Sequence, residues 1–220
     1  MGEFQLERRP VHEQLYDFLR NAILNGEIKP GERLLQDELA KRFGISRMPV
    51  RDVLRLLEAD KLVVRVPNKG VTVAEFGKEE LKDTFFVRSI LEREAVKLAI
   101  PNITKEDIIF LENLLQDMDK CLEEKDLKKL TKLNYKFHKA IYKGVPSQRL
   151  LDIIKNLWDN FPRYAMLSTL EDASRSQDAH RAILEAIKKG DSEEASKLME
   201  SHILAAAKAY ASRNENEEVK

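Results

Sequence analysis

Three of the four histidines in this chain stand at positions whose spacing could bring them together. Asn134 and His138 are four residues apart in a helical pattern, so their side chains share one helix face. His180 lies ten residues before Gly190, and His202 lies a similar distance after it. If these helices form an antiparallel pair about that turn, each imidazole lies ~15 Å from it, because a helix rises ~1.5 Å per residue. We therefore expect the imidazoles of His180 and His202 to lie at the same height along the two helices, where they could converge.

Three imidazoles and an amide oxygen form a ligand set for a divalent transition metal of the Zn, Ni or Mn class. Such a set leaves coordination positions open for a small molecule. The alternative is that each histidine is a hydrogen-bonded core or surface group, and the spacing alone leaves both interpretations open. A metal-dependent hydrolase could use the same residues with water in the open position, although no acidic residue is visibly placed as its general base.

Arg88 is the other candidate for ligand binding, because it is flanked by apolar residues on a predicted helix. An arginine that points inward requires an anion, and a bidentate carboxylate fits its geometry. That carboxylate could belong to a small effector or to a structural partner such as Glu92. Trp158, Phe161 and Tyr164 could line a pocket, but aromatic residues at helical spacing more often belong to the core.

The elements that must position these residues are all helical from residue 78 onward. Pro101 and Gly144 mark the ends of two of these helices. Thr104 with Asp107 forms the pattern of a capping box, and Pro162 should kink or split the fourth helix. A polar tail at 213–220 is expected to fray. The predicted helices are 78–99, 104–124, 126–143, 147–170, 173–189 and 191–212.

The first third of the chain predicts a different architecture. After a first helix from Pro10 to about Asn25, a short helix at 35–43 is followed by Gly44, which can take the left-handed conformation that closes a helix. Ser46 can cap the next helix, which runs to about Glu58. One face of that helix is apolar, and the other carries arginines at four-residue steps: Arg47, Arg51 and Arg55. This pattern is typical of a helix-turn-helix.

Two β-branched runs follow, at 62–66 and 71–74, and the short loop between them predicts a hairpin with Lys69 at its tip. Between Lys41 and Gly70 there are eight basic and three acidic residues, a net charge of +5 in a chain whose total is zero. A solvated basic face is the usual explanation of such a run. Because these residues fall on the recognition surface of a helix-turn-helix, we expect duplex DNA as the partner.

The segments Gly31–Leu34, Glu38–Ala40 and Gly44–Leu54 resemble the winged helix-turn-helix of GntR-family bacterial transcription regulators, and Pro67–Val73 resembles the family's wing. The resemblance implies DNA contacts from the matching residues Ser46, Arg47, Met48, Pro49, Arg51, Lys69 and Gly70. Family members often carry arginine where this chain has Asp37. An acid cannot pair with phosphate, so altered base preference or weaker binding is expected.

The segments around His138, His180 and His202 resemble the FCD effector domain of one GntR subfamily, in its six-helix metal-binding form. In that form an aspartate and three histidines hold the ion, and here the aspartate position is Asn134. An amide is a poorer ligand, so metal affinity should fall, yet a neutral ligand set would favour an anionic effector. The resemblance also implies an effector contact from Arg88.

The sequence thus predicts a mainly α protein with a winged helix-turn-helix domain of three helices and a hairpin wing at 1–76, an all-helical effector and dimerisation domain at 77–212, and a polar tail. We expect a cytoplasmic, homodimeric repressor that binds a pseudo-palindromic operator and senses a small organic acid. One cysteine and no apolar run of membrane length agree with this. An effector-free DNA-architectural protein is the remaining alternative.

Overall fold

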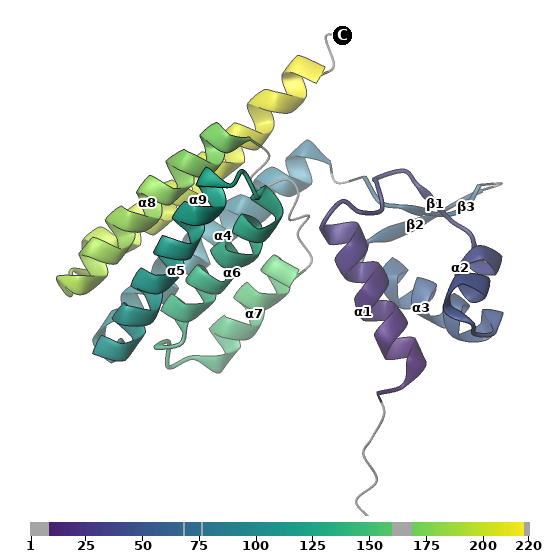
Figure 1. Cartoon of the computed structure of the whole chain (residues 1–220), viewed down its shortest axis with the longest axis horizontal. Helices are drawn as coiled ribbons and strands as arrows, with labels where there is room; N and C mark the ends of the chain where they lie inside the picture. Colours follow the sequence, from purple (N-terminus) through teal and green to yellow (C-terminus); the bar gives the residue numbers. More distant parts are fainter. Residues whose placement is uncertain (1–8, 68, 76, 160–168, 218–220) are drawn as a thin grey trace, which may run out of the picture. The chain divides into compact units, whose positions relative to one another are not determined.

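The computed structural model describes residues 9–67, 69–75, 77–159 and 169–217, and the chain divides into two compact units, Met1–Phe76 and Gly77–Lys220. Among the described residues, the first unit contains three helices and a small sheet, and the second contains helices without a strand; Figure 1 shows the arrangement within each unit. The mainly α fold class predicted from the sequence is confirmed. None of the described helices is both long and apolar enough to cross a membrane.

The first unit contains α1 (Val11–Leu24), α2 (Gln36–Phe43) and α3 (Arg47–Ala59). Its sheet consists of β1 (Arg33–Leu34), β2 (Val63–Val66) and β3 (Gly70–Val73), with β3 in the middle and both pairings antiparallel. The hairpin of β2 and β3 is the predicted wing. The sequence did not predict β1, because two residues are too short a run to show a strand period.

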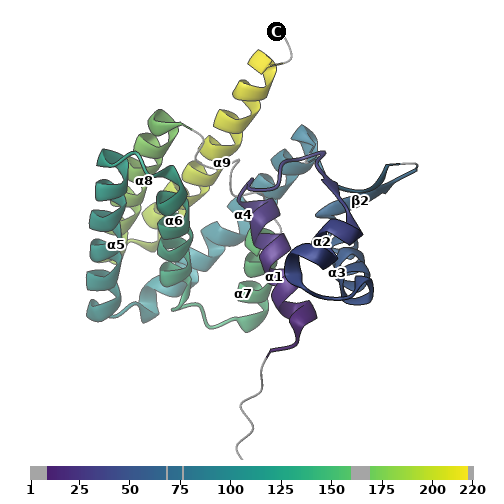
Figure 2. The same cartoon turned by 45° about the vertical axis from the view of Figure 1, so that its right-hand side comes forward.

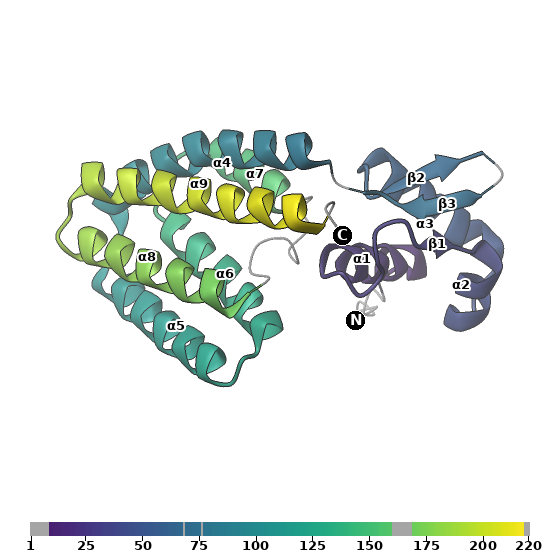
Figure 3. The same ribbon diagram turned by 90° about the horizontal axis from the view of Figure 1, so that it is seen from above.

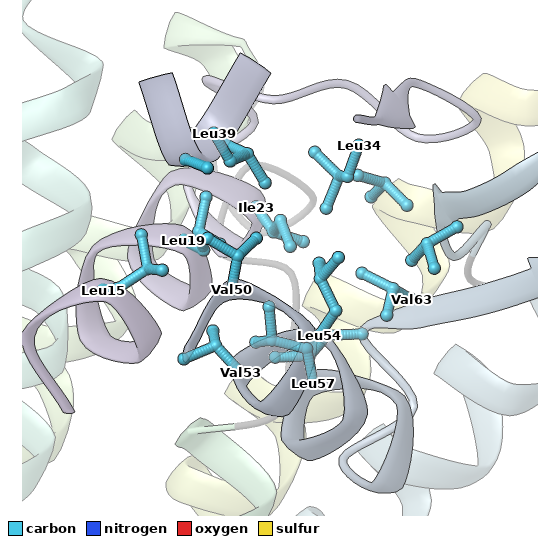
Figure 4. Packing of buried hydrophobic residues seen from close by; sticks show 14 of the residues in the cluster. Leu15, Leu19, Ile23, Leu34, Leu39, Val50, Val53, Leu54, Leu57 and Val63 are labelled. Atoms are coloured by element: carbon cyan, nitrogen blue, oxygen red, sulfur yellow. The ribbon is translucent and has the colours of Figure 1, made fainter. Parts of the chain in front are cut away.

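A single apolar core holds the first unit together (Figure 4). The recognition helix α3 contributes the predicted stripe of Val50, Val53, Leu54 and Leu57, each fully buried. Its burial fixes the opposite, arginine-bearing face toward solvent. Gly44 has φ +65° at the end of α2, as the turn requires.

From the sequence we expect Val11, Leu15, Phe18 and Ala22 to form the buried stripe of α1, and this prediction is partly wrong. Leu15 and Ala22 are buried, but Val11 and Phe18 are 54% and 42% exposed, and the buried face includes Leu19 instead. Phe18 lies at the margin of the core, where its ring packs edge-on against Phe43 with the centroids 5.1 Å apart.

The second unit is a bundle of α4 (Lys78–Ala99), α5 (Lys105–Glu123), α6 (Leu127–Tyr142), α7 (Gln148–Asp159), α8 (Leu170–Lys188) and α9 (Ser192–Glu217). A one-turn helix at Ile100–Asn102 follows α4. Seen from above, α9 lies along α4 on one side and along α8 on the other (Figure 3), and α5 packs against α6 and α8.

Caps fix the ends of these helices as the sequence predicts. Thr104 and Asp107 form the capping box of α5, and the Asp191 carboxylate accepts the Glu194 backbone N–H at 3.0 Å. Together with the turn at Gly190, the second cap makes α8 and α9 an antiparallel pair, which is the arrangement that brings two of the histidines level.

Two boundaries differ from the sequence prediction. Leu170 does not end the fourth helix but begins α8, where the Thr169 side chain accepts the Asp172 N–H. The predicted kink at Pro162 and the aromatic residues Phe161 and Tyr164 lie outside the described residues. The expected frayed tail is helical as far as Glu217, because α9 continues without a breaker through the polar segment.

Candidate functional site

The imidazoles of His138, His180 and His202 converge in the second unit, from α6, α8 and α9. The Nε2 atom of His138 lies 3.3 Å from that of His180 and 3.2 Å from that of His202. All candidate ligand nitrogens lie within 4.8 Å of one another. A tetrahedral ion bound at ~2.0–2.1 Å by each nitrogen would set those nitrogens ~3.3 Å apart, so the cluster has the dimensions of a metal centre.

Burial gives these histidines the protonation state that metal binding requires. It lowers the pKa of His202 to about 3 and that of His180 well below the ordinary value, where repulsion from the neighbouring imidazoles adds to it. Burial also lowers the pKa of His138, against the opposing attraction of Glu92. At neutral pH all three rings are therefore neutral, which is the form in which imidazole binds metals.

Asn134 supplies the oxygen of the candidate set. It is 2% exposed and stands one turn before His138 on α6. Among the described residues, its Oδ1 atom has no hydrogen-bond partner. A buried acceptor without a donor costs free energy, and a cation is one way to satisfy it. The residues present therefore fit a divalent transition metal.

Glu92, which the sequence indicates only as a partner for Arg88, lies behind the cluster and orients it. Its carboxylate lies 3.3 Å from Nδ1 of His138 and accepts hydrogen bonds from the Tyr142 hydroxyl and, at 3.0 Å, from Trp158 Nε1. With Nδ1 of His138 protonated and donating, its Nε2 lone pair points to the other imidazoles. Burial opposes the charge on Glu92, but Arg88 and His138 outweigh it and hold the pKa at about 2.

Arg88 forms the ion pair with Glu92 that was one of its two predicted roles. Its Nε donates to Glu92 at 2.7 Å, and its guanidinium lies 3.8 Å from the ring centroid of Trp158. The side chain is 1% exposed and does not line the cavity described next.

A cavity of about 840 Å³ opens between α5, α6 and α7, which lie together in Figure 1. His138 and Tyr142 form part of its wall, so the cavity reaches the histidine cluster. Lys136 and Lys139 line it from α6, and neither forms an ion pair with a described residue. The apolar part of the lining comes from Phe110, Tyr135, Leu151, Ile154 and Trp158. Four lysines and three acidic residues line the cavity, a net charge of 4 − 3 = +1; the acids are Glu106, Asp107 and Asp152. The apolar side chains suit a ligand with an apolar body.

The second surface of interest lies on the first unit. Arg47 and Arg51 are exposed on α3, and Met48 between them is 65% exposed although it is apolar. No described carboxylate lies within ion-pair distance of Arg51. Lys69 and Gly70 are exposed at the wing, where Gly70 has φ +83°.

The structure corrects one local prediction and adds an unpredicted contact. Ser46 stands at the N-cap of α3 with extended backbone, but its side chain makes no capping hydrogen bond, so its hydroxyl is exposed and available. Pro49 follows in the first turn, half-buried. The Asp37 carboxylate on α2 lies 2.6 Å from Nε of Arg47.

A basic winged helix joined to an all-helical bundle defines a class of DNA-binding transcription regulators. A model of the domain described as "Bacterial regulatory proteins, gntR family" matches residues 11–73, and a model of the FCD domain matches residues 83–205. The chain belongs to the GntR family and carries an FCD domain in its second unit.

Relatives that match over most of their own length support the same family. The chain is 31% identical to the HTH-type transcriptional regulator YdhC of Bacillus subtilis, over 93% of this chain and 92% of that protein. It is 32% identical to the HTH-type transcriptional repressor GlaR of Escherichia coli, over 86% of this chain and 90% of the repressor.

Solved structures share the fold. McbR/YncC of E. coli matches with a TM-score of 0.80 at 25% identity, over 94% of this chain and 100% of that one. A GntR regulator from Rhodococcus sp. RHA1 matches with a TM-score of 0.78 at 21% identity, over 91% of this chain and 97% of that one. The chain is therefore a DNA-binding transcription regulator and not an enzyme, which removes the hydrolase alternative.

Proposed function

We propose that this regulator is a repressor whose helical unit senses a small carboxylate metabolite through a bound divalent transition metal of the Zn, Ni or Mn class. The ion would be held by His138, His180, His202 and Asn134. The single observation that carries this proposal is the convergence of three neutral imidazoles, two buried and one half-buried, beside an amide oxygen that lacks a described donor. When bound, the ion supplies positive charge for an anion that the neutral ligand set does not cancel.

The effector would occupy the cavity between α5, α6 and α7. His138 belongs to both the cavity wall and the histidine cluster, so an occupant would contact a metal ligand directly. Lys136 and Lys139 add positive charge at the α6 side. To act as a switch, the ligand must bind the DNA-competent and incompetent arrangements of the bundle with different affinity. We propose that ligand binding releases the DNA. We also propose that the regulator acts in the cytoplasm.

DNA binding would follow the winged-helix pattern. Helix α3 enters the major groove, where Arg47 and Arg51 reach base edges or adjacent phosphates. Met48 is placed to contact a thymine methyl group, and Ser46 and Pro49 lie against the backbone. At the wing, Lys69 and Gly70 approach the minor groove or its phosphates.

A homodimer would present two such helices to a pseudo-palindromic operator. Helix α4 supports this proposal because it is apolar on two sides. One side is buried in the bundle, and the other carries Phe86, Ile90 and Leu98, which are 58%, 45% and 42% exposed. Apolar residues along one helix face mark a surface that a partner covers, and we propose a second copy of the chain.

The test is the metal content of the purified protein, measured by elemental analysis together with native mass spectrometry. The wild type should carry about one ion per chain, and the double variant His180→Ala/His202→Ala should carry none. His12→Ala, which removes an exposed histidine of the first unit, should leave the content unchanged. Equal metal content in the double variant and the wild type would show that the site is elsewhere.

A second measurement separates this proposal from an effector-free architectural protein. Operator affinity is measured with metal-loaded protein, after chelation, and with an aliphatic and an aromatic carboxylate added to the loaded form. The operator affinity of a sensor changes in at least one of these conditions, whereas an architectural protein binds the operator equally well in all of them.

A further inference from the structure

An ion pair lies on the face that this regulator presents to DNA. Asp37 is in the first turn of α2, and Arg47 is the first residue of α3. The Asp37 Oδ1 atom lies 2.6 Å from Nε of Arg47, and the two side chains are 63% and 73% exposed. Figure 2 shows the two helices side by side in the first unit.

Stability does not account for this pair. An ion pair between side chains this exposed contributes little to folding stability. The packing of α2 and α3 rests instead on buried residues such as Leu39, Val50 and Leu54. The pair therefore bears on what Arg47 does when DNA arrives.

The geometry of the ion pair decides which nitrogens of the Arg47 guanidinium remain free to bind DNA. A guanidinium has five N–H donors in one plane, and the carboxylate forms its ion pair on the Nε side of that plane. The edge formed by the two terminal nitrogens remains, and this edge pairs in a bidentate manner with O6 and N7 of guanine. Holding the side chain at Nε also reduces the rotamer freedom that Arg47 would lose on binding.

The charge of Asp37 also favours base contacts of Arg47 over phosphate contacts. A carboxylate beside Arg47 cancels much of the attraction that the guanidinium would exert on any phosphate. It leaves the directional hydrogen bonds to a base almost intact. Arg51, one turn further along α3, has no such acid among the described residues and keeps its full charge for the backbone or a base.

We propose that Asp37 is a specificity-determining residue: it holds Arg47 by Nε so that the terminal edge of the guanidinium reads a guanine in the major groove, and it weakens the attraction of Arg47 to phosphate. This inference rests on the proposed role of Arg47 as a base-reading residue. It predicts a guanine at one fixed position of each operator half-site.

The experiment is selection of binding sites from a random duplex library by the full-length protein, followed by affinity measurements on selected and random duplexes. The variants are Asp37→Ala, Arg47→Ala and the double variant. Glu38→Ala is the matched control, because Glu38 is the neighbouring exposed acid in the same turn of α2 and forms no ion pair with a described residue.

We expect Asp37→Ala to reduce the preference for guanine at one position by about 5- to 10-fold, a part of what a bidentate pair discriminates. Other positions should keep their preference, and affinity for random duplexes should rise. Glu38→Ala should raise affinity for random duplexes in the same way without changing any base preference. In the Arg47→Ala background, Asp37→Ala should not change the base preferences further.

Two results would overturn the inference, and they differ. If Asp37→Ala raises affinity for every sequence and leaves the base preferences of the wild type intact, Asp37 only repels phosphate and does not orient Arg47. If Arg47→Ala itself leaves all preferences intact, the base-reading role of Arg47 fails and the role of Asp37 fails with it. Circular dichroism of each variant verifies that the winged helix remains folded.

Discussion

Glu92 is the residue on which the interior of the helical unit depends. Its buried carboxylate is held by Arg88 on its own helix, by His138 and Tyr142 on α6, and by Trp158 on α7. A buried charge is tolerated only when partners satisfy it, and here the partners also aim an imidazole at the candidate metal position. One side chain thus links the packing of three helices to the chemistry of the histidine cluster.

Glu92→Gln should destabilise the helical unit by about 3–5 kcal/mol, because it replaces the buried carboxylate that pairs with Arg88 by a neutral amide. It should also lower metal affinity by about 10- to 100-fold, since the orientation of His138 is no longer held by a carboxylate. Denaturant unfolding and a competitive metal titration measure the two effects.

Glu94→Gln is the matched control, because Glu94 lies on the same helix but is exposed. It should change stability by less than about 1 kcal/mol and leave metal affinity as it is. Wild-type values for Glu92→Gln in both measurements would show that the carboxylate does not organise the site.

At the scale of elements, the close approach of two helix ends sets the position of α6. Gly144 follows this helix, and a Cβ atom added there would lie 2.7 Å from the backbone oxygen of Ala99. Asn102 holds the same point by donating to the Gly144 carbonyl at 2.8 Å. Since α6 carries both Asn134 and His138, this junction fixes where two of the four candidate metal ligands stand.

Gly144→Ala should therefore destabilise the helical unit by about 1–3 kcal/mol, the usual cost of overpacking against backbone that cannot move freely. Thermal unfolding measures the change. Lys132→Ala, at an exposed position of α6, should stay within about 0.5 kcal/mol of the wild type. If the glycine variant matches this control, the ends of α4 and α6 can separate without cost.

At the scale of the whole molecule, the two units should differ in their response to acid. The three clustered histidines all belong to the second unit, where burial lowers their pKa values. A base whose folded pKa is depressed stays neutral in the native state, while the unfolded chain takes up protons below about pH 6.5. Stability is therefore complete above that pH and is lost as the pH falls toward the folded pKa, about 3 for His202.

We expect the metal-free helical unit to lose up to about 1.4 kcal/mol per pH unit for each buried histidine as the pH falls from 6.5 to 5. Below pH 4.5, protonation of Glu92 in the unfolded chain adds to the loss, because its folded pKa is about 2. The only tryptophan of the chain, Trp158, lies in this unit, so its fluorescence during denaturant unfolding reports on this unit alone.

His202→Gln should reduce the pH dependence of the free energy of unfolding of the helical unit, whereas His12→Gln in the first unit should not. A free energy of unfolding that is the same at pH 7 and pH 5 would contradict the burial of neutral imidazoles.

The sequence by itself determined the features that depend on neighbouring residues. Helix caps such as Thr104 with Asp107, the glycine turn at Gly44 and the apolar stripe of α3 are local, because each is set by residues within one or two helical turns. The convergence of His180 with His202 was also predictable, since a tight antiparallel hairpin fixes which positions are level. These features were enough to predict the winged helix and the helical bundle.

Only the tertiary structure decided which polar side chains meet. Nothing in the local pattern shows that Asp37 reaches Arg47 across a turn, or that Trp158 donates to Glu92 over 66 positions. The tertiary structure also placed Arg88 in the interior, paired with Glu92. Such contacts depend on how helices pack and on the rotamers that packing allows, and neither is encoded in the spacing of one segment.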